Sequence, residues 1–118
     1  MREERGTLGG PQTVFEPFNL WGSIGGDVRV IQGGKLYVRG AIYGDLTVEY
    51  GGRAHIFGNV TGNLRVERGA KVIHSGIVGK DAQNTGGRLY VEPKAKIMGR
   101  LITSGGETKD DRPAPEPR

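Results

Sequence analysis

The sequence contains no cysteine, few aromatic residues and no long apolar run. Without cysteine, the chain can form neither a disulfide framework nor a thiolate zinc site. Its 3 phenylalanines, 4 tyrosines and 1 tryptophan among 118 residues are too few for a core built on large rings. No apolar stretch approaches the roughly 20 residues of a membrane-spanning helix, and the charged start is unlike a signal peptide. We therefore expect a cytoplasmic protein, with association at a membrane surface left open.

Glycine, in contrast, is abundant, with 22 residues. A collagen triple helix would need glycine at every third position and many prolines, whereas this chain has no such period and 6 prolines. The 17 basic and 13 acidic residues give a net charge of +4. This surplus suits weak attraction to anionic surfaces but not the dense basic footprint of a dedicated nucleic-acid binder. We expect no specific nucleic-acid partner.

An 18-residue repeat runs through the middle of the chain. Glycine, aliphatic, Asp/Asn and basic residues all recur with this spacing. The recurring sets are Gly22, Gly40, Gly58 and Gly76; Gly33, Gly51, Gly69 and Gly87; Ile24, Ile42, Val60 and Val78; Asp27, Asp45, Asn63 and Asp81; and Lys35, Arg53 and Lys71. Inside this repeat, every sixth residue over 24–78 is aliphatic. Three six-residue sides predict an all-β fold in which one chain winds into a triangular β-helix, or β-solenoid.

Elementary stereochemistry supports this prediction. Glycine permits sharp corners, and β-branched residues suit short strands. Each coil would pair its backbone with coils about 4.8 Å above and below, so that equivalent residues stack in ladders. Because Asp and Asn hydrogen-bond nearby backbone groups at turns, we expect the Asp/Asn ladder to stabilise corners rather than to bind calcium.

The predicted solenoid occupies residues 22–104 as four to five coils. Residues 1–21 are expected to form a partly flexible N-terminal arm that can cap the first coil. Residues 105–118, rich in Gly, Pro and charge, are expected to be a disordered tail. The segment 64–72 has a close counterpart at 89–97, which lies further along the chain than the regular repeat would place it. This spacing predicts a loop inserted within residues 79–88.

No catalytic, cofactor-binding or metal-binding constellation is found in the sequence, and we expect no enzyme activity. The chain has two histidines, His55 and His74. His55 follows an inward position and should face solvent. His74 shares its phase with Val38 and Ile56, so it should lie at a corner or partly inside, as a hydrogen-bonded structural residue.

A basic stripe is also predicted along one face of the solenoid. Its members are Lys35, Arg53, Lys71 and Lys96. A solvated face of mixed charge explains these residues. The functional alternative is contact with an anionic partner: a membrane, a cell-wall-associated protein or nucleic acid.

Repeat units such as those at 41–48 and 58–64 resemble the units of bactofilins, bacterial cytoskeletal proteins that form polymers. The resemblance covers residues 22–104. It implies a right-handed, triangular β-helix that assembles end to end into filaments without nucleotide. The sequence departs from the family in its smaller number of coils and in the insertion at 79–88.

The ends of such a solenoid are the expected interface for self-assembly, because open strand edges pair with other chains. The residues predicted there are Ile24, Val28 and Val30 in the first coil and Leu89, Val91, Ile97 and Leu101 in the last. We therefore expect a structural scaffold that forms a homopolymer or homo-oligomer.

Two alternatives remain open at the level of sequence. One is a rigid binding module that presents the 79–88 loop to a partner. The other is a trimer similar to hexapeptide-repeat transferases, which have a left-handed coil with the same six-residue period.

Overall fold

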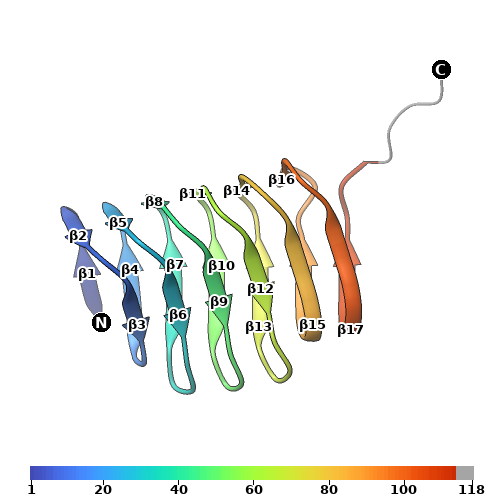
Figure 1. The fold of residues 1–118 in the computed structure, drawn as a ribbon, viewed down its shortest axis with the longest axis horizontal. Helices are drawn as coiled ribbons and strands as arrows, with labels where there is room; N and C mark the ends of the chain where they lie inside the picture. Colours follow the sequence, from blue (N-terminus) through green and yellow to red (C-terminus); the bar gives the residue numbers. More distant parts are fainter. Residues whose placement is uncertain (114–118) are drawn as a thin grey trace.

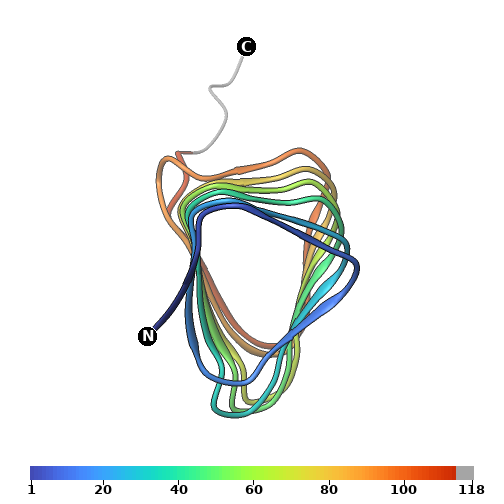
Figure 2. The same cartoon turned by 90° about the vertical axis from the view of Figure 1, so that its left-hand side faces the viewer.

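The structure, a computed structural model that describes residues 1–113, is a β-solenoid of about six coils with about 18 residues in each. Figure 1 shows the coils stacked along the long axis, with the N-terminus at one end and the last strands at the other. Viewed along that axis, the coils superimpose into a rounded triangle (Figure 2). The all-β solenoid predicted from the repeat is confirmed. The coil number exceeds the four to five expected.

The strands lie on three sides of the triangle and pair in parallel with their counterparts in the next coil. Side 1 comprises β1 (Arg2–Glu4), β4 (Pro17–Leu20), β7 (Lys35–Val38), β10 (Arg53–Ile56) and β13 (Lys71–His74). Side 2 comprises β2 (Thr7–Gly9), β5 (Ser23–Gly25), β8 (Ala41–Ile42), β11 (Asn59–Val60), β14 (Ile77–Val78) and β16 (Lys96–Ile97). Side 3 comprises β3 (Gln12–Val14), β6 (Val28–Val30), β9 (Leu46–Val48) and β12 (Leu64–Val66). The long strands β15 (Ala82–Val91) and β17 (Leu101–Asp110) run along side 3, round the corner and along side 1.

Strand register confirms that residues one repeat apart stack on one another in the middle of the solenoid. Arg53, for example, pairs with Lys35 on one side and with Lys71 on the other. At the N-terminal end the coil is shorter, because Arg2 pairs with Phe18. Near the other end the spacing first shortens, where Lys71 pairs with Arg88, and then lengthens, where Val78 pairs with Ile97. The coil length therefore varies at both ends while the ladders stay in register.

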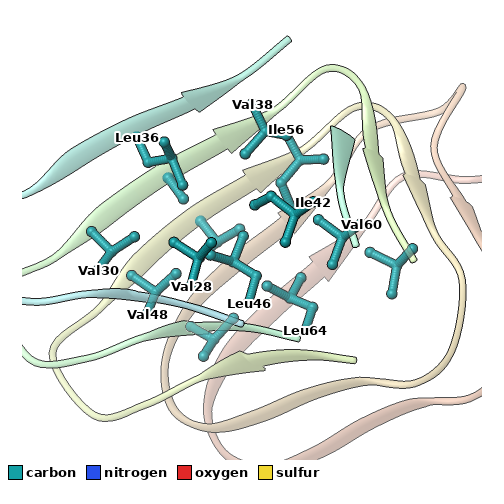
Figure 3. Packing of buried hydrophobic residues seen from close by; sticks show 14 of the residues in the cluster. Val28, Val30, Leu36, Val38, Ile42, Leu46, Val48, Ile56, Val60 and Leu64 are labelled. Atoms are coloured by element: carbon teal, nitrogen blue, oxygen red, sulfur yellow. The ribbon is translucent and has the colours of Figure 1, made fainter. Parts of the chain in front are cut away.

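The inward positions form one continuous aliphatic core. On β9, Leu46 and Val48 are fully buried, whereas Thr47 between them points outward and is half-buried. Figure 3 shows buried Val, Leu and Ile side chains from successive coils meeting inside the triangle. Complete burial of each such side chain contributes about 1.5–3 kcal/mol to stability, which explains how a chain with few aromatic residues can support this fold.

The Asp/Asn ladder joins each coil to the next through side-chain-to-backbone hydrogen bonds. The backbone N–H of Asp45 donates to Asp27 Oδ1 at 2.8 Å, and that of Asn63 donates to Asp45 Oδ1 at 2.7 Å. The ladder continues from Asp81 N–H to Asn63 Oδ1 and ends with Arg100 N–H on Asp81 Oδ1. The expected stabilisation of the corners is thus confirmed, and the bonds link neighbouring coils.

Glycine is required at two kinds of corner. At Gly40, an added Cβ would lie 1.8 Å from the carbonyl oxygen of Gly22, because successive coils approach closely there. At another corner, Gly51 and Gly69 have φ angles of 77° and 78°, which glycine adopts readily and other residues avoid. Close approach explains the ladder from Gly22 to Gly76, and positive φ explains Gly33, Gly51 and Gly69 in the other.

The N-terminal arm predicted over residues 1–21 is instead a complete first coil. Strands β1, β2 and β3 pair with β4, β5 and β6 over their whole length. Leu8 stacks on Ile24 and Val14 on Val30, so the inward phase continues into this segment. The shorter spacing of this coil hides its residues from a comparison at the regular repeat length, and the predicted start at residue 22 was wrong.

The solenoid also extends beyond the predicted boundary at residue 104. Strand β17 continues to Asp110 and pairs with β15, so residues 105–110 belong to the last coil and not to a tail. The part of the predicted tail at 114–118 lies outside the described residues. The inward positions of β17 are largely polar, with Thr108 stacked on Leu89 and Asp110 on Val91, which is why the sequence pattern did not identify this strand.

Residues 79–88 contain no inserted loop. In the structure Leu64 stacks on Ala82, while Leu89 stacks on Val72. The two similar segments, 64–72 and 89–97, therefore lie on different sides of the triangle, and each runs from one strand through a corner to the next. The prediction of an insertion was wrong because it aligned two segments that are similar in sequence but form different corners of the triangle.

Candidate functional site

Five of the seven residues predicted at the assembly interface are internal. Ile24, Val28 and Val30 are fully buried beneath the additional first coil. Leu89 and Val91 are each 1% exposed beneath β17. The two others, Ile97 and Leu101, are half-buried in the last coil. The prediction failed for the first five residues because the solenoid has an additional coil at the N-terminus and a further strand at the C-terminus.

The true N-terminal end is covered by charged and apolar side chains together. Arg2 and Glu4 occupy inward phase on β1, above Phe18 and Leu20. The Arg2 guanidinium lies over the Phe18 ring, with Cζ 4.3 Å from its centroid. Leu8 remains half-buried beside them. This end therefore offers an apolar residue within a charged rim.

The C-terminal end is more polar. Thr103 Oγ1 donates to Thr108 Oγ1 at 2.8 Å, and Asn84 Nδ2 donates to the same Thr108 oxygen at 3.0 Å. Arg112 Nη2 lies 2.9 Å from Asp110 Oδ2, and the hydrogen bond from Arg112 lowers the pKa of the Asp110 carboxyl. The last coil thus covers the aliphatic core with hydrogen-bonded polar groups.

Asn84 is a fully buried polar residue with all of its hydrogen-bonding capacity used. Its Oδ1 accepts the N–H groups of Gly86 and Gly87 at 3.1 and 2.8 Å. The two N–H groups of its Nδ2 are shared among three acceptors, the carbonyl oxygens of Gly87 and Glu107 at 3.1 and 3.0 Å and Thr108 Oγ1 at 3.0 Å. Asn84 therefore shapes the corner of β15 and ties it to β17.

The two histidines differ in environment. His55 lies on the outer face of side 1, as expected, where it stacks on Phe57 with ring centroids 3.8 Å apart and hydrogen-bonds Ser75 at 3.2 Å. His74 is fully buried in the core, and its Nε2 lies 2.9 Å from the carbonyl oxygen of Lys96. Its Nδ1 is buried and has no hydrogen-bond partner among residues 1–113. Burial lowers the pKa of both imidazoles.

The basic stripe has a different fourth member from the one predicted. Lys35, Arg53 and Lys71 stack in register at the start of the side 1 strands, and Arg88 pairs with Lys71 as the next member. Lys96 lies instead on side 2, where it pairs with Ile77. The error again follows from aligning residues 89–97 with the wrong side. We call Lys35, Arg53, Lys71 and Arg88 the basic row.

The basic row stands between two hollows. On one side, a groove of about 610 Å³ follows the glycine corner and is lined by Arg53, Lys71 and Arg88. On the other side, Lys35, Arg53 and Lys71 border a hollow of about 200 Å³ that also contacts Tyr37 and His55. The four cations lie in exposed positions. Within residues 1–113, the ion pairs are Arg29 with Glu49 and Arg112 with Asp110, so no member of the row forms an ion pair with a carboxylate.

A second ladder, at the far end of the side 1 strands, alternates arginine with aromatic rings. Arg39 Cζ lies 4.8 Å from the Trp21 ring centroid and 4.7 Å from that of Phe57. Arg5 Cζ lies 5.1 Å from Trp21. Contacts of this kind within about 6 Å are attractive. This ladder was not predicted, although Trp21, Arg39 and Phe57 follow the regular spacing of the repeat.

Residues 1–113 contain no group of three or more His, Asp or Glu side chains arranged to hold a metal ion. No helix long and apolar enough to cross a membrane occurs in this part of the chain. No protein-family model, curated protein or solved structure matches the chain.

Proposed function

We propose that this chain is a structural scaffold that assembles end to end through its terminal coils without nucleotide, as its resemblance to bactofilins implies. The observation that carries the proposal is the unpaired strand edge at each end. Within residues 1–113, β1, β2 and β3 have strand neighbours on one side only, as have β16 and β17 at the other end. Such edges offer rows of backbone N–H and C=O groups to another chain.

The ladder register supports a head-to-tail contact between copies. Continuing side 2 from β16 into the β2 strand of a second copy places Leu8 against Ile97. Both residues are half-buried in a single copy, and the contact would cover them further. Continuing side 1 from β17 into β1 places Glu3 against Lys109, which is a favourable cross-strand charge pair.

Charged residues at the ends would limit the strength of this contact. The same register places Glu4 opposite Asp110, although Arg112 already pairs with that carboxylate. Charges on exposed edges restrain uncontrolled strand pairing. We therefore expect a reversible assembly whose extent depends on protein concentration.

The proposal includes a right-handed winding, a cytoplasmic location, and a membrane surface or cell-wall-associated protein as a second partner. In Figure 2 the chain turns clockwise as it recedes from the N-terminal end, which supports the right-handed winding. The alternative of a module presenting an inserted loop has lost its premise, since residues 79–88 form a corner and part of β15.

Engineered cysteines can test the contact and its polarity, because the chain has no cysteine of its own. Leu8→Cys and Ile97→Cys variants would be mixed under mild oxidation. Stacked residues lie about 4.8 Å apart, within the Cα separation that a disulfide tolerates. We expect cross-linked dimers in the mixture and none with either variant alone. The matched control is Tyr43→Cys, an exposed site away from both ends, which should form no disulfide-linked dimer.

Two results would overturn the proposal in different ways. Dimers from Leu8→Cys alone would indicate a head-to-head contact and contradict the register. A single monomeric species of the unmodified chain, measured by sedimentation velocity across a wide concentration range, would contradict self-assembly itself.

A further inference from the structure

We propose that the outer face of side 1 binds single-stranded nucleic acid, independently of sequence and of the assembly proposed above. The face combines two parallel rows that run along the solenoid axis. One is the basic row of Lys35, Arg53, Lys71 and Arg88. The other, on the next outward position of each strand, is formed by Tyr37, His55, Ile73 and Tyr90.

The basic row is a line of like charges. Its four cations, stacked at about 4.8 Å intervals, repel one another, and none forms an ion pair with a carboxylate within residues 1–113, although Arg88 lies opposite Glu107 on the neighbouring strand. Glu107 follows Arg88 in the ladder and ends the row, while Pro17 precedes Lys35. A linear polyanion laid along the axis would neutralise the row over a length of about 14 Å.

The surface beside the row is hollowed. The hollow that contains Tyr37 and His55 is followed by one of about 280 Å³ that contains Ile73 and Tyr90, and Lys71 borders both. The far edge of the second hollow is of mixed charge, with Lys109, Glu92 and Asp111. Planar and apolar side chains thus lie alongside the cations over four successive coils. Proteins that bind single strands without sequence preference combine these elements, with cations tracking the phosphates and aromatic rings stacking on bases.

The three sides differ in their outward rows. Side 2 has Thr7, Ser23, Ala41, Asn59 and Ile77 in its outward row before Lys96. On side 3, Arg29 is paired with Glu49, and Arg65 bonds Gln83 in a row that contains no aromatic ring. Side 1 is therefore the side on which cations that form no ion pair within residues 1–113 lie next to a row with aromatic rings. A membrane would also attract such residues, but two rows confined to one narrow face fit a linear polymer better than a broad lipid surface.

The test is fluorescence anisotropy of the full chain with labelled oligothymidylate and oligouridylate of about 12 nucleotides. For four neutralised phosphates, log K should fall with log salt concentration at a slope of about −3, and the slope should halve when two cations are removed. The row variant is Arg53→Gln with Lys71→Gln. Its matched control is Lys80→Gln with Lys96→Gln, which removes the same charge from exposed sites elsewhere.

We expect the row variant to weaken binding by roughly tenfold or more at about 0.1 M salt, and the control to change it little. Tyr37→Ala should weaken binding at least about fivefold through lost stacking, whereas Tyr43→Ala, at an exposed site on another side, should not. Thermal melts followed by circular dichroism would verify folding. If the row variant proved unstable, Lys35→Gln with Arg88→Gln removes the same charge from the ends of the row.

Three outcomes would overturn the proposal. Equal losses in the row variant and its control would indicate general charge attraction. Inorganic polyphosphate binding as tightly as the oligonucleotides, with no effect of Tyr37→Ala, would indicate a polyanion site that ignores bases. Binding to phosphatidylserine vesicles without binding to either oligonucleotide would indicate a lipid surface.

Discussion

His74 should make the stability of this solenoid sensitive to mild acid. It lies in an inward ladder with Val38, Ile56 and Val91. Because its Nε2–H donates to the carbonyl oxygen of Lys96, its Nδ1 is the unprotonated nitrogen, and that atom is buried without a partner. Protonation would place a cation with an unsatisfied N–H among aliphatic side chains, which is costly. Burial accordingly lowers the pKa of His74, although the Lys96 carbonyl opposes part of this shift.

The sign and size of the effect follow from proton linkage. The unfolded chain takes up a proton at His74 below about pH 6.5, whereas the folded chain does so at a lower pH. The free energy of unfolding should therefore be independent of His74 above that pH. It should fall by up to about 1.4 kcal/mol per pH unit below it. The total loss on acidification is set by how far burial lowers the pKa of His74 in the folded chain.

Urea unfolding followed by circular dichroism at several pH values would measure this loss. The variant is His74→Leu, which removes the titrating group and keeps an apolar side chain in the ladder. We expect its free energy of unfolding to be much flatter between pH 6.5 and 5 than that of the unmodified chain. His55→Gln is the control, since His55 is partly exposed and should contribute a smaller slope. Parallel curves for the unmodified chain and His74→Leu would refute this account.

Three other substitutions test the core, the Asp/Asn ladder and the corners, with thermal or urea unfolding as the measurement. Val48→Asp should prevent folding, because it buries an unpaired carboxylate, whereas the outward Thr47→Asp should change stability little; equal stability would mean that the inward phase is misassigned. Asp45→Ala should cost about 1–3 kcal/mol by leaving the Asn63 N–H without its acceptor, and a neutral result would show that water replaces it. Gly40→Ala should destabilise strongly, since its Cβ would meet backbone at 1.8 Å, and an unchanged melting temperature would contradict that close approach.

Sequence periodicity could predict the middle of this fold because every coil there has the same length. Val48, for instance, was correctly placed inside and Thr47 outside. The ends could not be predicted in the same way, since the step from Leu8 to Ile24 is shorter than the regular repeat and that from Val78 to Ile97 is longer. A search for residues at one fixed spacing therefore misassigns the inward and outward positions at both places. The solenoid tolerates these changes because a corner can gain or lose a residue while the strands remain stacked.

The candidate site was predictable to the same extent. Three of the four members of the basic row follow the regular repeat, whereas Arg88 follows Lys71 at a shorter spacing and was missed. The complete burial of His74 could not be predicted from its residue type. A polar imidazole interrupts the apolar pattern of an inward ladder, which favours a corner or a partly buried position. Whether the outer face of side 1 binds an anionic partner cannot be predicted from spacing, because it depends on which cations form ion pairs in the folded chain.

The stacking of like strands has a consequence for how the chain acquires its structure. Ladder partners in the paired strands are separated in sequence by a single coil, from Arg2 and Phe18 at one end to Val91 and Asp110 at the other. Most all-β proteins must instead bring together distant segments, and their folding is correspondingly slow. Here each added coil closes a loop of nearly constant length, so its entropic cost is nearly constant as well. Folding can begin at any adjacent pair of coils and extend in both directions.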